Sequence, residues 1–248
     1  MVLSALLGRA VPGFRPRSRP RGAAADSHRL PLTPPVGTCM IHSTLSPVKP
    51  FSKKFFGAVN ALMGRLIFIV GGARSGKSKH ALLRAIEESP SGRVAFLATA
   101  IPTDEDMRRR IEEHRRKRPK GWATFEEPLE PEELAQKLAG KFEAILIDCL
   151  TLWLFNWFER LREGRSPPEL EGALGERAER LVLGLRRAVD SGGATLIVVS
   201  NEVGMGVVPS DPYDRAFCDS LGRLNQLVAE AADEVILVCC GIPLRIKP

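Results

Sequence analysis

A glycine-rich loop with the spacing G-x-x-x-x-G-K-S is the segment of the chain best suited to chemistry. An apolar run, Ile67 to Val70, precedes this loop and a helical pattern follows it. In that context successive backbone N–H groups point at phosphate oxygens, and the helix adds its positive end. Lys77 would reach the β- and γ-phosphates and Ser78 would ligate Mg²⁺, which favours a phosphate-binding loop over a plain glycine turn. The loop consists of Gly71, Gly72, Ala73, Arg74, Ser75, Gly76, Lys77 and Ser78.

Asp148 is the second candidate, because it ends the apolar run Ala144 to Ile147. An acid in this position is typical of the residue that holds Mg²⁺ beside a phosphate-binding loop. The alternative is an aspartate that only caps the next helix. The need of the loop for a metal partner favours the first interpretation.

His114 is the third candidate and lies in the charged stretch 103–118. Thr103 and Asp106 predict a helix N-cap. One face of this helix would carry Met107, Ile111, His114 and Arg118. The cationic neighbours favour a neutral imidazole and attract phosphate, and such an imidazole beside an α-phosphate can act as a nucleophile. A charged helix with one histidine is more often a solvated surface, so the residues alone favour that interpretation.

A loop rich in glycine follows the apolar run Thr195 to Val199 and begins with Ser-Asn-Glu at 200–202. A buried strand that ends in polar residues and a glycine loop is typical of a substrate or catalytic loop, with Glu202 as its candidate residue. A plain surface loop remains the alternative.

These residues require a scaffold, and the pattern predicts an α/β domain with a mostly parallel sheet flanked by helices. We expect strands near 66–70, 93–98, 143–148, 194–200 and 233–240, and a short closing strand at 244–247. We expect helices near 77–89, 104–117, 131–140, 171–191 and 211–231. Ligands gather at the carboxyl ends of parallel strands, where Asp148 and Glu202 would lie.

The charge of the chain is unevenly distributed. The net charge of the chain is +7, and residues 1–64 alone carry +8. The remainder therefore carries −1 and gives no reason to expect nucleic-acid binding. We interpret residues 1–63 as a disordered basic extension, either a targeting segment or a mis-assigned start, and residues 64–248 as one domain. The apolar stretch 144–158 is too short and too interrupted for a membrane span, which predicts a soluble protein without an integral membrane segment.

The five cysteines form no metal-binding pattern and favour a reducing cytoplasm. Cys239 and Cys240 follow an apolar run, so we expect them to be buried strand residues. The three tryptophans are expected to pack rather than to stack on bases, because no basic stripe accompanies them.

Six blocks together resemble the bifunctional adenosylcobinamide kinase / adenosylcobinamide-phosphate guanylyltransferase family. They are 71–78, 110–119 with Trp122, Ile-Asp-Cys-Leu-Thr at 147–151, Ser-Asn-Glu-Val-Gly-Met-Gly-Val-Val-Pro at 200–209, Gly-Arg-Leu-Asn-Gln at 222–226 and 232–235. The resemblance implies a P-loop NTPase-like, RecA-like sheet and an enzyme of cobalamin biosynthesis. It would phosphorylate adenosylcobinamide with ATP or GTP, then transfer GMP from GTP to the product with release of pyrophosphate.

The resemblance also implies roles for individual residues. His114 matches the histidine that carries the covalent GMP, and 71–78 matches the phosphate-binding loop. Asp148 matches an acid with a metal or nucleotide role, and Glu202 a glutamate that would orient the substrate hydroxyl or Mg²⁺. Arg118 would bind nucleotide, in its own site or in that of a neighbour within a homotrimer. Glu113 stands where some relatives have a second histidine.

Two other classes of protein compete with this interpretation. A P-loop kinase of another small molecule would keep the loop at 71–78 but would leave His114 without a task. A RecA-like ATPase acting on nucleic acid would need a basic groove, which the charge of −1 argues against.

Overall fold

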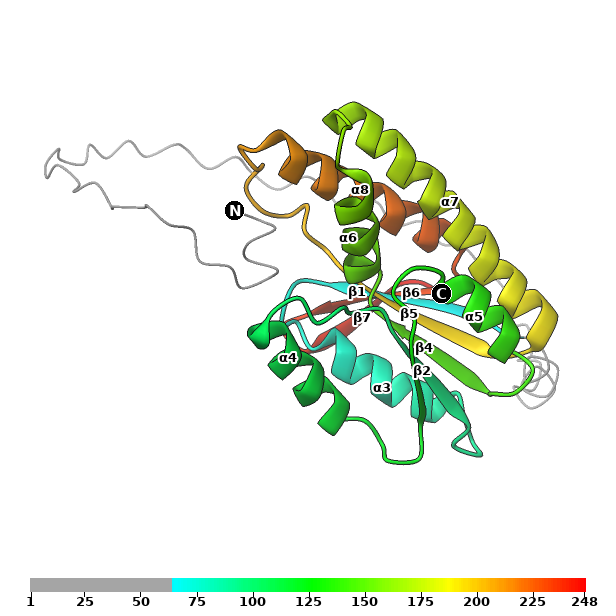
Figure 1. Ribbon diagram of the computed structural model, residues 1–248. Coiled ribbons are helices and arrows are strands. Elements are labelled where there is room, and N and C mark those ends of the chain that lie inside the picture. The colour runs from blue at the N-terminus through cyan, green and yellow to red at the C-terminus, as the bar shows by residue number, and fades with distance from the viewer. Residues whose placement is uncertain (1–63) are drawn as a thin grey trace, which may run out of the picture.

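The computed structural model describes residues 64–248, which form a sheet between two layers of helices (Figure 1). The strand order is β3-β2-β4-β5-β1-β6-β7, with β1 to β6 parallel and β7 antiparallel to β6. The strands are β1 (Leu66–Gly71), β2 (Val94–Ala98), β3 (Ala123–Glu126), β4 (Ala144–Asp148), β5 (Thr195–Asn201), β6 (Glu234–Cys239) and β7 (Ile242–Lys247). The helices are α3 (Lys77–Glu87), α4 (Glu105–Arg116), α5 (Pro131–Leu138), α6 (Leu150–Leu161), α7 (Pro167–Gly192) and α8 (Pro212–Ala231). The predicted α/β architecture is confirmed; the extension 1–63 lies outside the described residues.

Both faces of the central strands β1, β2, β4 and β5 are buried, which explains why these strands are apolar runs rather than alternating patterns. In β1, Leu66 and Phe68 pack in the cluster that includes residues of α5 to α8, whereas Ile67 and Ile69 pack in the cluster that includes residues of α3. Figure 1 shows α3 and α4 on one side of the sheet and α6, α7 and α8 on the other. The strands are therefore held on both sides, and their carboxyl ends are fixed in space.

Two elements were not predicted, α6 and β3. α6 is apolar along most of its length and begins only two residues after the end of β4, so in the sequence the two elements form one apolar stretch. The indole N–H groups of Trp153 and Trp157 both donate to the carbonyl of Leu129, at 2.7 and 3.1 Å, which confirms their packing role. β3 is a four-residue strand at one edge of the sheet, and its pattern is too short to stand out.

Two elements begin earlier than expected, and one apolar stretch divides. α7 begins at Pro167, not at 171, because Ser166 and Glu169 form a capping box and proline fits the first helical position. β7 begins at Ile242, two residues early. The apolar stretch 144–158 divides into β4 and α6, and within 64–248 no helix is both long and apolar enough to cross a membrane.

The expectation that Cys239 and Cys240 are buried is wrong. Cys239 is the last residue of β6, and Cys240 lies in the turn to β7 with a φ of 51°. Both thiols are free and exposed. The reason is that β6 reaches the edge of the core at Val238, so the two following residues leave it.

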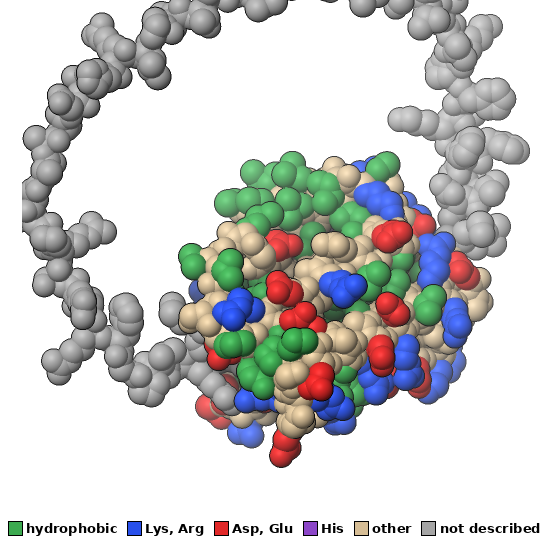
Figure 2. All heavy atoms as spheres, turned by 90° about the horizontal axis from the view of Figure 1, so that it is seen from above, with side chains coloured by type: hydrophobic (Ala, Val, Ile, Leu, Met, Phe, Trp, Pro, Cys, Tyr) green, Lys and Arg blue, Asp and Glu red, His purple; other side chains and the backbone are tan. Residues whose placement is uncertain are grey.

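The helical face of Figure 2 carries acidic and basic side chains mixed together, with apolar patches between them. No continuous basic stripe crosses this face, as the near-neutral charge of the domain predicts. A phosphate backbone would therefore find no extended track here.

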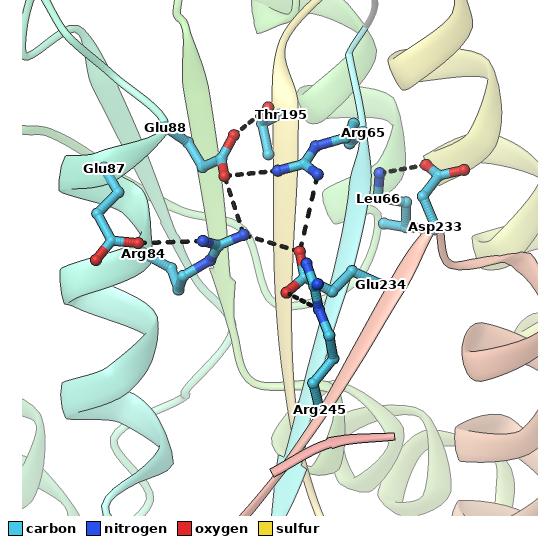
Figure 3. A network of polar contacts seen from close by, with 9 residues as sticks. All are labelled: Arg65, Leu66, Arg84, Glu87, Glu88, Thr195, Asp233, Glu234 and Arg245. Carbon is cyan, nitrogen blue, oxygen red and sulfur yellow. Dashed lines mark hydrogen bonds and ion pairs between the residues drawn. The ribbon is translucent and has the colours of Figure 1, made fainter. Parts of the chain in front are cut away.

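An ion-pair network ties the end of α3 to the first residues of β1 and β6 (Figure 3). Glu234, whose side chain is 5% exposed, accepts from Arg84 at 2.8 Å and from Arg245 at 3.0 Å. Arg65 lies 3.9 Å away. Burial alone would raise the pKa of Glu234, but the hydrogen bond from Arg245 and the charges of the three arginines outweigh it and hold the pKa below its ordinary value.

We expect Glu234→Gln to lower the free energy of unfolding by about 2 kcal/mol, because it removes a buried charge that accepts from Arg84 and Arg245, while Glu88 still pairs with Arg84. The folded pKa of Glu234 lies below the unfolded one, so its contribution is present above the unfolded pKa and is lost as pH falls through the folded value. Urea unfolding at neutral and acid pH measures both effects.

Glu87→Gln is the matched control, since Glu87 also pairs with Arg84 but is 62% exposed. We expect it to cost less than about 1 kcal/mol. Equal unfolding midpoints for Glu234→Gln and the native chain at neutral pH would contradict a stabilising role for the network.

Candidate active site

The phosphate-binding loop connects β1 to α3, as predicted. Gly71 cannot carry a side chain, because a Cβ there would lie 2.3 Å from the carbonyl oxygen of Val238. Gly76 has a φ of 95°, a left-handed conformation that favours glycine. The Lys77 side chain folds back over the loop and its Nζ donates to the carbonyl of Gly72 at 3.1 Å. The ammonium group is therefore already held against the backbone that would cradle phosphate.

Lys77, Ser78 and Asp148 meet at the carboxyl ends of the strands. Ser78 lies beside the Asp148 carboxylate, and Asp148 is 13% exposed. Burial raises the pKa of Asp148, although the charges of His114 and Lys77 and the neighbouring Ser78 hydroxyl oppose the rise. Burial likewise lowers the pKa of Lys77, although the charges of Cys149 and Asp148 oppose it. A bound phosphate beside the amine and a cation beside the carboxylate would each favour the charged form.

The oxygen atoms of Ser78 and Asp148 fit Mg²⁺, which commonly takes one or two protein ligands and completes its shell with phosphates and water. Ser78 and Asp148 are neighbours, so both oxygen ligands lie beside the loop. Within residues 64–248 no group of three or more His, Cys, Asp or Glu could hold a metal ion. A magnesium ion here would therefore depend on the nucleotide for its remaining ligands.

Helix α4 positions His114, with one correction to the predicted cap. The N-cap is Asp104, not Thr103. The backbone of Asp104 is extended, and its carboxylate accepts from the backbone N–H of Met107 at 2.8 Å. Met107 is buried and anchors the helix. The helix ends at Arg116, so the predicted face does not extend to Arg118.

The structure brings His114 to Asp148. The imidazole Nδ1 lies 3.9 Å from Asp148 Oδ2, and the ring is 49% exposed. One carboxylate thus faces both the serine of the phosphate-binding loop and the histidine of α4. The imidazole can therefore approach a phosphate group that the loop holds.

Arg118 lies just beyond α4, in an unusual setting. Its guanidinium carbon lies 3.5 Å from the centroid of the Phe96 ring, and its Nε is buried without a hydrogen-bond partner. Burial lowers its pKa, while the charge of Asp148 opposes the change. A hollow of about 350 Å³ adjoins it, lined by Arg115, Arg116, Arg118, Pro119, Lys120, Trp122 and Thr124. This hollow suits an anion with an apolar or aromatic portion.

The loop after β5 also reaches the site. The backbone N–H of Glu202 donates to the carbonyl of Gly71 at 3.0 Å, and Glu202 Oε1 accepts from the N–H of Gly204 at 2.7 Å. The carboxylate therefore braces its own loop. The apolar side chains of this loop point outward and are strongly exposed; they are Met205, Val207 and Val208.

Four positioning residues were missed by the sequence analysis. The buried Thr99 hydroxyl donates to the carbonyl of Cys149 and accepts from its N–H, at 2.7 and 2.9 Å, which fixes the chain after Asp148. Asn156 donates to the carbonyl of Thr99 at 2.8 Å. The backbone N–H of Asn201 donates to the hydroxyl of Thr151 at 2.9 Å, and the side-chain amide of Asn225 donates to the carbonyl of Asn201 at 3.0 Å. The position of Thr99 directly after an apolar strand run was an available signal.

Comparison with known proteins gives a consistent result. Residues 67–246 match the family model described as cobinamide kinase / cobinamide phosphate guanyltransferase. The bifunctional adenosylcobalamin biosynthesis protein CobP of Pseudomonas aeruginosa is 41% identical over 187 residues, which cover 72% of this chain and 95% of the relative. The proteins named CobU of Escherichia coli K12 and Salmonella typhimurium LT2 are 36% and 38% identical, each covering 73% of this chain and 99% of the relative.

Proposed function

The chain belongs to the cobinamide kinase / cobinamide phosphate guanyltransferase family, and we propose that a single site around Asp148 serves both reactions of this bifunctional enzyme. One residue carries the proposal. The Asp148 carboxylate lies beside Ser78 of the phosphate-binding loop and 3.9 Å from Nδ1 of His114. The residues of phosphoryl transfer and the candidate nucleophile of guanylyl transfer therefore share one carboxylate.

In the kinase step, the loop at 71–78 binds ATP or GTP through its backbone amides, and Lys77 neutralises charge that develops on the γ-phosphate. The hydroxyl of adenosylcobinamide attacks this phosphorus as the bond to the β-phosphate oxygen breaks, and the hydroxyl proton passes to solvent. Mg²⁺ held by Ser78 and Asp148 would supply further positive charge between the phosphates. The remaining task of the protein is to hold donor and acceptor in line.

In the guanylyl step, His114 Nε2 attacks the α-phosphorus of GTP, and pyrophosphate leaves as the bond between the α- and β-phosphates breaks. Asp148 lies on the Nδ1 side, so it favours the tautomer with the proton there and stabilises the positive ring. A phosphate oxygen of adenosylcobinamide phosphate then attacks the same phosphorus. The P–N bond breaks, His114 returns to its neutral form, and the product is adenosylcobinamide-GDP.

Arg118 and the basic hollow beside it contribute to holding the nucleotide in this step, since guanidinium groups bind phosphate strongly. We place adenosylcobinamide against the loop of Glu202, because its exposed Met205, Val207 and Val208 offer apolar surface to a macrocycle. In this arrangement Glu202 keeps the loop in shape and orients the substrate hydroxyl.

We place both activities within residues 64–248, and the family match at 67–246 supports this assignment. We further propose a homotrimer, supported by apolar side chains exposed on α3 and β7: Leu83, Ile86, Ile242, Leu244 and Ile246. A monomer mass by light scattering would overturn the trimer. The cytoplasmic location stays a prediction.

A product assay tests the function directly. The full chain is incubated with adenosylcobinamide, GTP and Mg²⁺, and the corrinoid products are followed by mass spectrometry. We expect adenosylcobinamide phosphate first and adenosylcobinamide-GDP afterwards, with pyrophosphate released in the second phase. Phosphorylation without the GDP product would reduce the chain to a kinase, and neither product would overturn the proposal.

A further inference from the structure

The turn between β6 and β7 presents two neighbouring thiols to solvent. Cys239 and Cys240 are both free and exposed, and the Sγ of Cys239 donates to that of Cys240 at 3.8 Å. Cys240 and Gly241 both have positive φ, at 51° and 83°. A side chain at Cys240 thus occupies a backbone conformation that L-residues rarely adopt.

This turn contacts the phosphate-binding loop through its backbone. The N–H of Gly241 donates to the carbonyl of Ser75 at 2.8 Å. A Cβ added to Gly76 would lie 3.3 Å from the Cα of Gly241. A Cβ added to Gly71 would lie 2.3 Å from the carbonyl oxygen of Val238. Backbone atoms in such close contact cannot move independently, so the turn fixes the conformation of the loop.

We propose that Cys239 and Cys240 form a thiol-oxidation site that controls nucleotide binding by the phosphate-binding loop. The oxidant is a small-molecule disulfide. Cys240, whose Sγ accepts the hydrogen bond from Cys239, attacks one sulfur of this disulfide as the thiolate and releases one thiol. Cys239 then attacks the mixed disulfide at the Cys240 sulfur and releases the second thiol. An S–S bond forms between Cys239 and Cys240, two electrons pass to the oxidant, and their two protons leave with the two small thiols or with solvent.

Closure of this bond must change the turn. The sulfur atoms are 3.8 Å apart, and a disulfide requires about 2.05 Å together with a specific dihedral angle. Adjacent residues can meet this geometry only by rotating the peptide between them. Rotation moves the N–H of Gly241 away from the carbonyl of Ser75, and the loop loses that support. Exposed disulfides of this kind are easily reduced again, as a reversible control requires.

The other described cysteines do not offer this chemistry. Cys149 is buried and burial raises its pKa to about 11, while Cys218 on α8 is only partly accessible and has no neighbouring thiol among the described residues. The site is therefore defined by the pair. The inference rests on the proposed function only in assuming that nucleotide binds at 71–78.

The test uses the full chain with Cys39→Ser and Cys218→Ser, so that the pair holds the accessible thiols. Affinity for a fluorescent GTP analogue is measured in the reduced state, after oxidised glutathione, and after re-reduction with dithiothreitol. We expect the peptide carrying both cysteines to lose about 2 Da on oxidation. We expect Kd to rise by about tenfold, the effect of one lost supporting hydrogen bond, and to recover on reduction.

Cys240→Ser in the same background is the matched control and should keep the reduced-state Kd under both conditions. Stable glutathione adducts or interchain dimers in place of the internal bond would overturn the proposal, and so would the internal bond with an unchanged Kd. Failure of the reduced chain to bind the analogue would instead overturn nucleotide binding at 71–78, and both proposals with it.

Discussion

His114→Asn is expected to abolish guanylyl transfer while sparing most of the kinase activity. Native protein mixed with α-labelled GTP and Mg²⁺ should gain one GMP per site and release pyrophosphate, and the variant should gain none. The amide of asparagine has the size of part of the ring but cannot act as a nucleophile. The kinase step needs only a nucleotide held against a hydroxyl, which the phosphate-binding loop provides.

The chemistry of the label identifies the residue class. A phosphoramidate is labile in acid and stable in base, because the P–N bond leaves once its nitrogen is protonated. Glu113→Gln is the matched control, since Glu113 is an exposed neighbour on the same helix and should leave labelling unchanged. A label that persists in His114→Asn, or that maps to a lysine, would overturn the mechanism.

Lys77→Ala is expected to lower phosphoryl transfer by roughly 10³-fold, because the lost charge stabilises the γ-phosphate in the transition state. Burial already disfavours the charged form of Lys77, so its removal should not destabilise the fold. We expect the thermal midpoint to stay at or above the native value. Single-turnover transfer from γ-labelled ATP, read beside a melting curve, measures the two quantities separately.

Lys79→Ala provides the comparison, since Lys79 is an exposed residue two positions further along α3. Its rate should match that of the native chain. A rate for Lys77→Ala within a few-fold of native would remove Lys77 from the chemistry.

Much of the scaffold was predictable because its signals are local. The parallel sheet was visible in apolar runs that alternate with helical patterns, and the loop at 71–78 was visible because glycine spacing dictates its backbone. Asp148 was predictable too, since the carboxyl end of a buried strand is where such a fold exposes polar groups. α6 was missed because it follows β4 almost directly and the two form one apolar stretch in the sequence.

The two cysteines illustrate how a local pattern can mislead. The apolar run that ends β6 predicts burial for Cys239 and Cys240, yet both are exposed. Where a strand leaves the core depends on where its partner strand turns back, and β7 turns back at Ile242. The residue at which β6 leaves the core is therefore set by β6 and β7 together, and the apolar run of β6 alone does not reveal it.

The sequence by itself determined the phosphate-binding loop, the α/β class and, through the resemblance, the family. Only the tertiary structure decided that His114 and Ser78 both face Asp148. From the residues alone His114 was expected on a solvated surface, and its ring is indeed half exposed. Its meeting with Asp148 depends on where α4, with its Asp104 cap and buried Met107, lies relative to the end of β4. The spacing of residues within one element cannot encode a distance between two elements that only packing brings together.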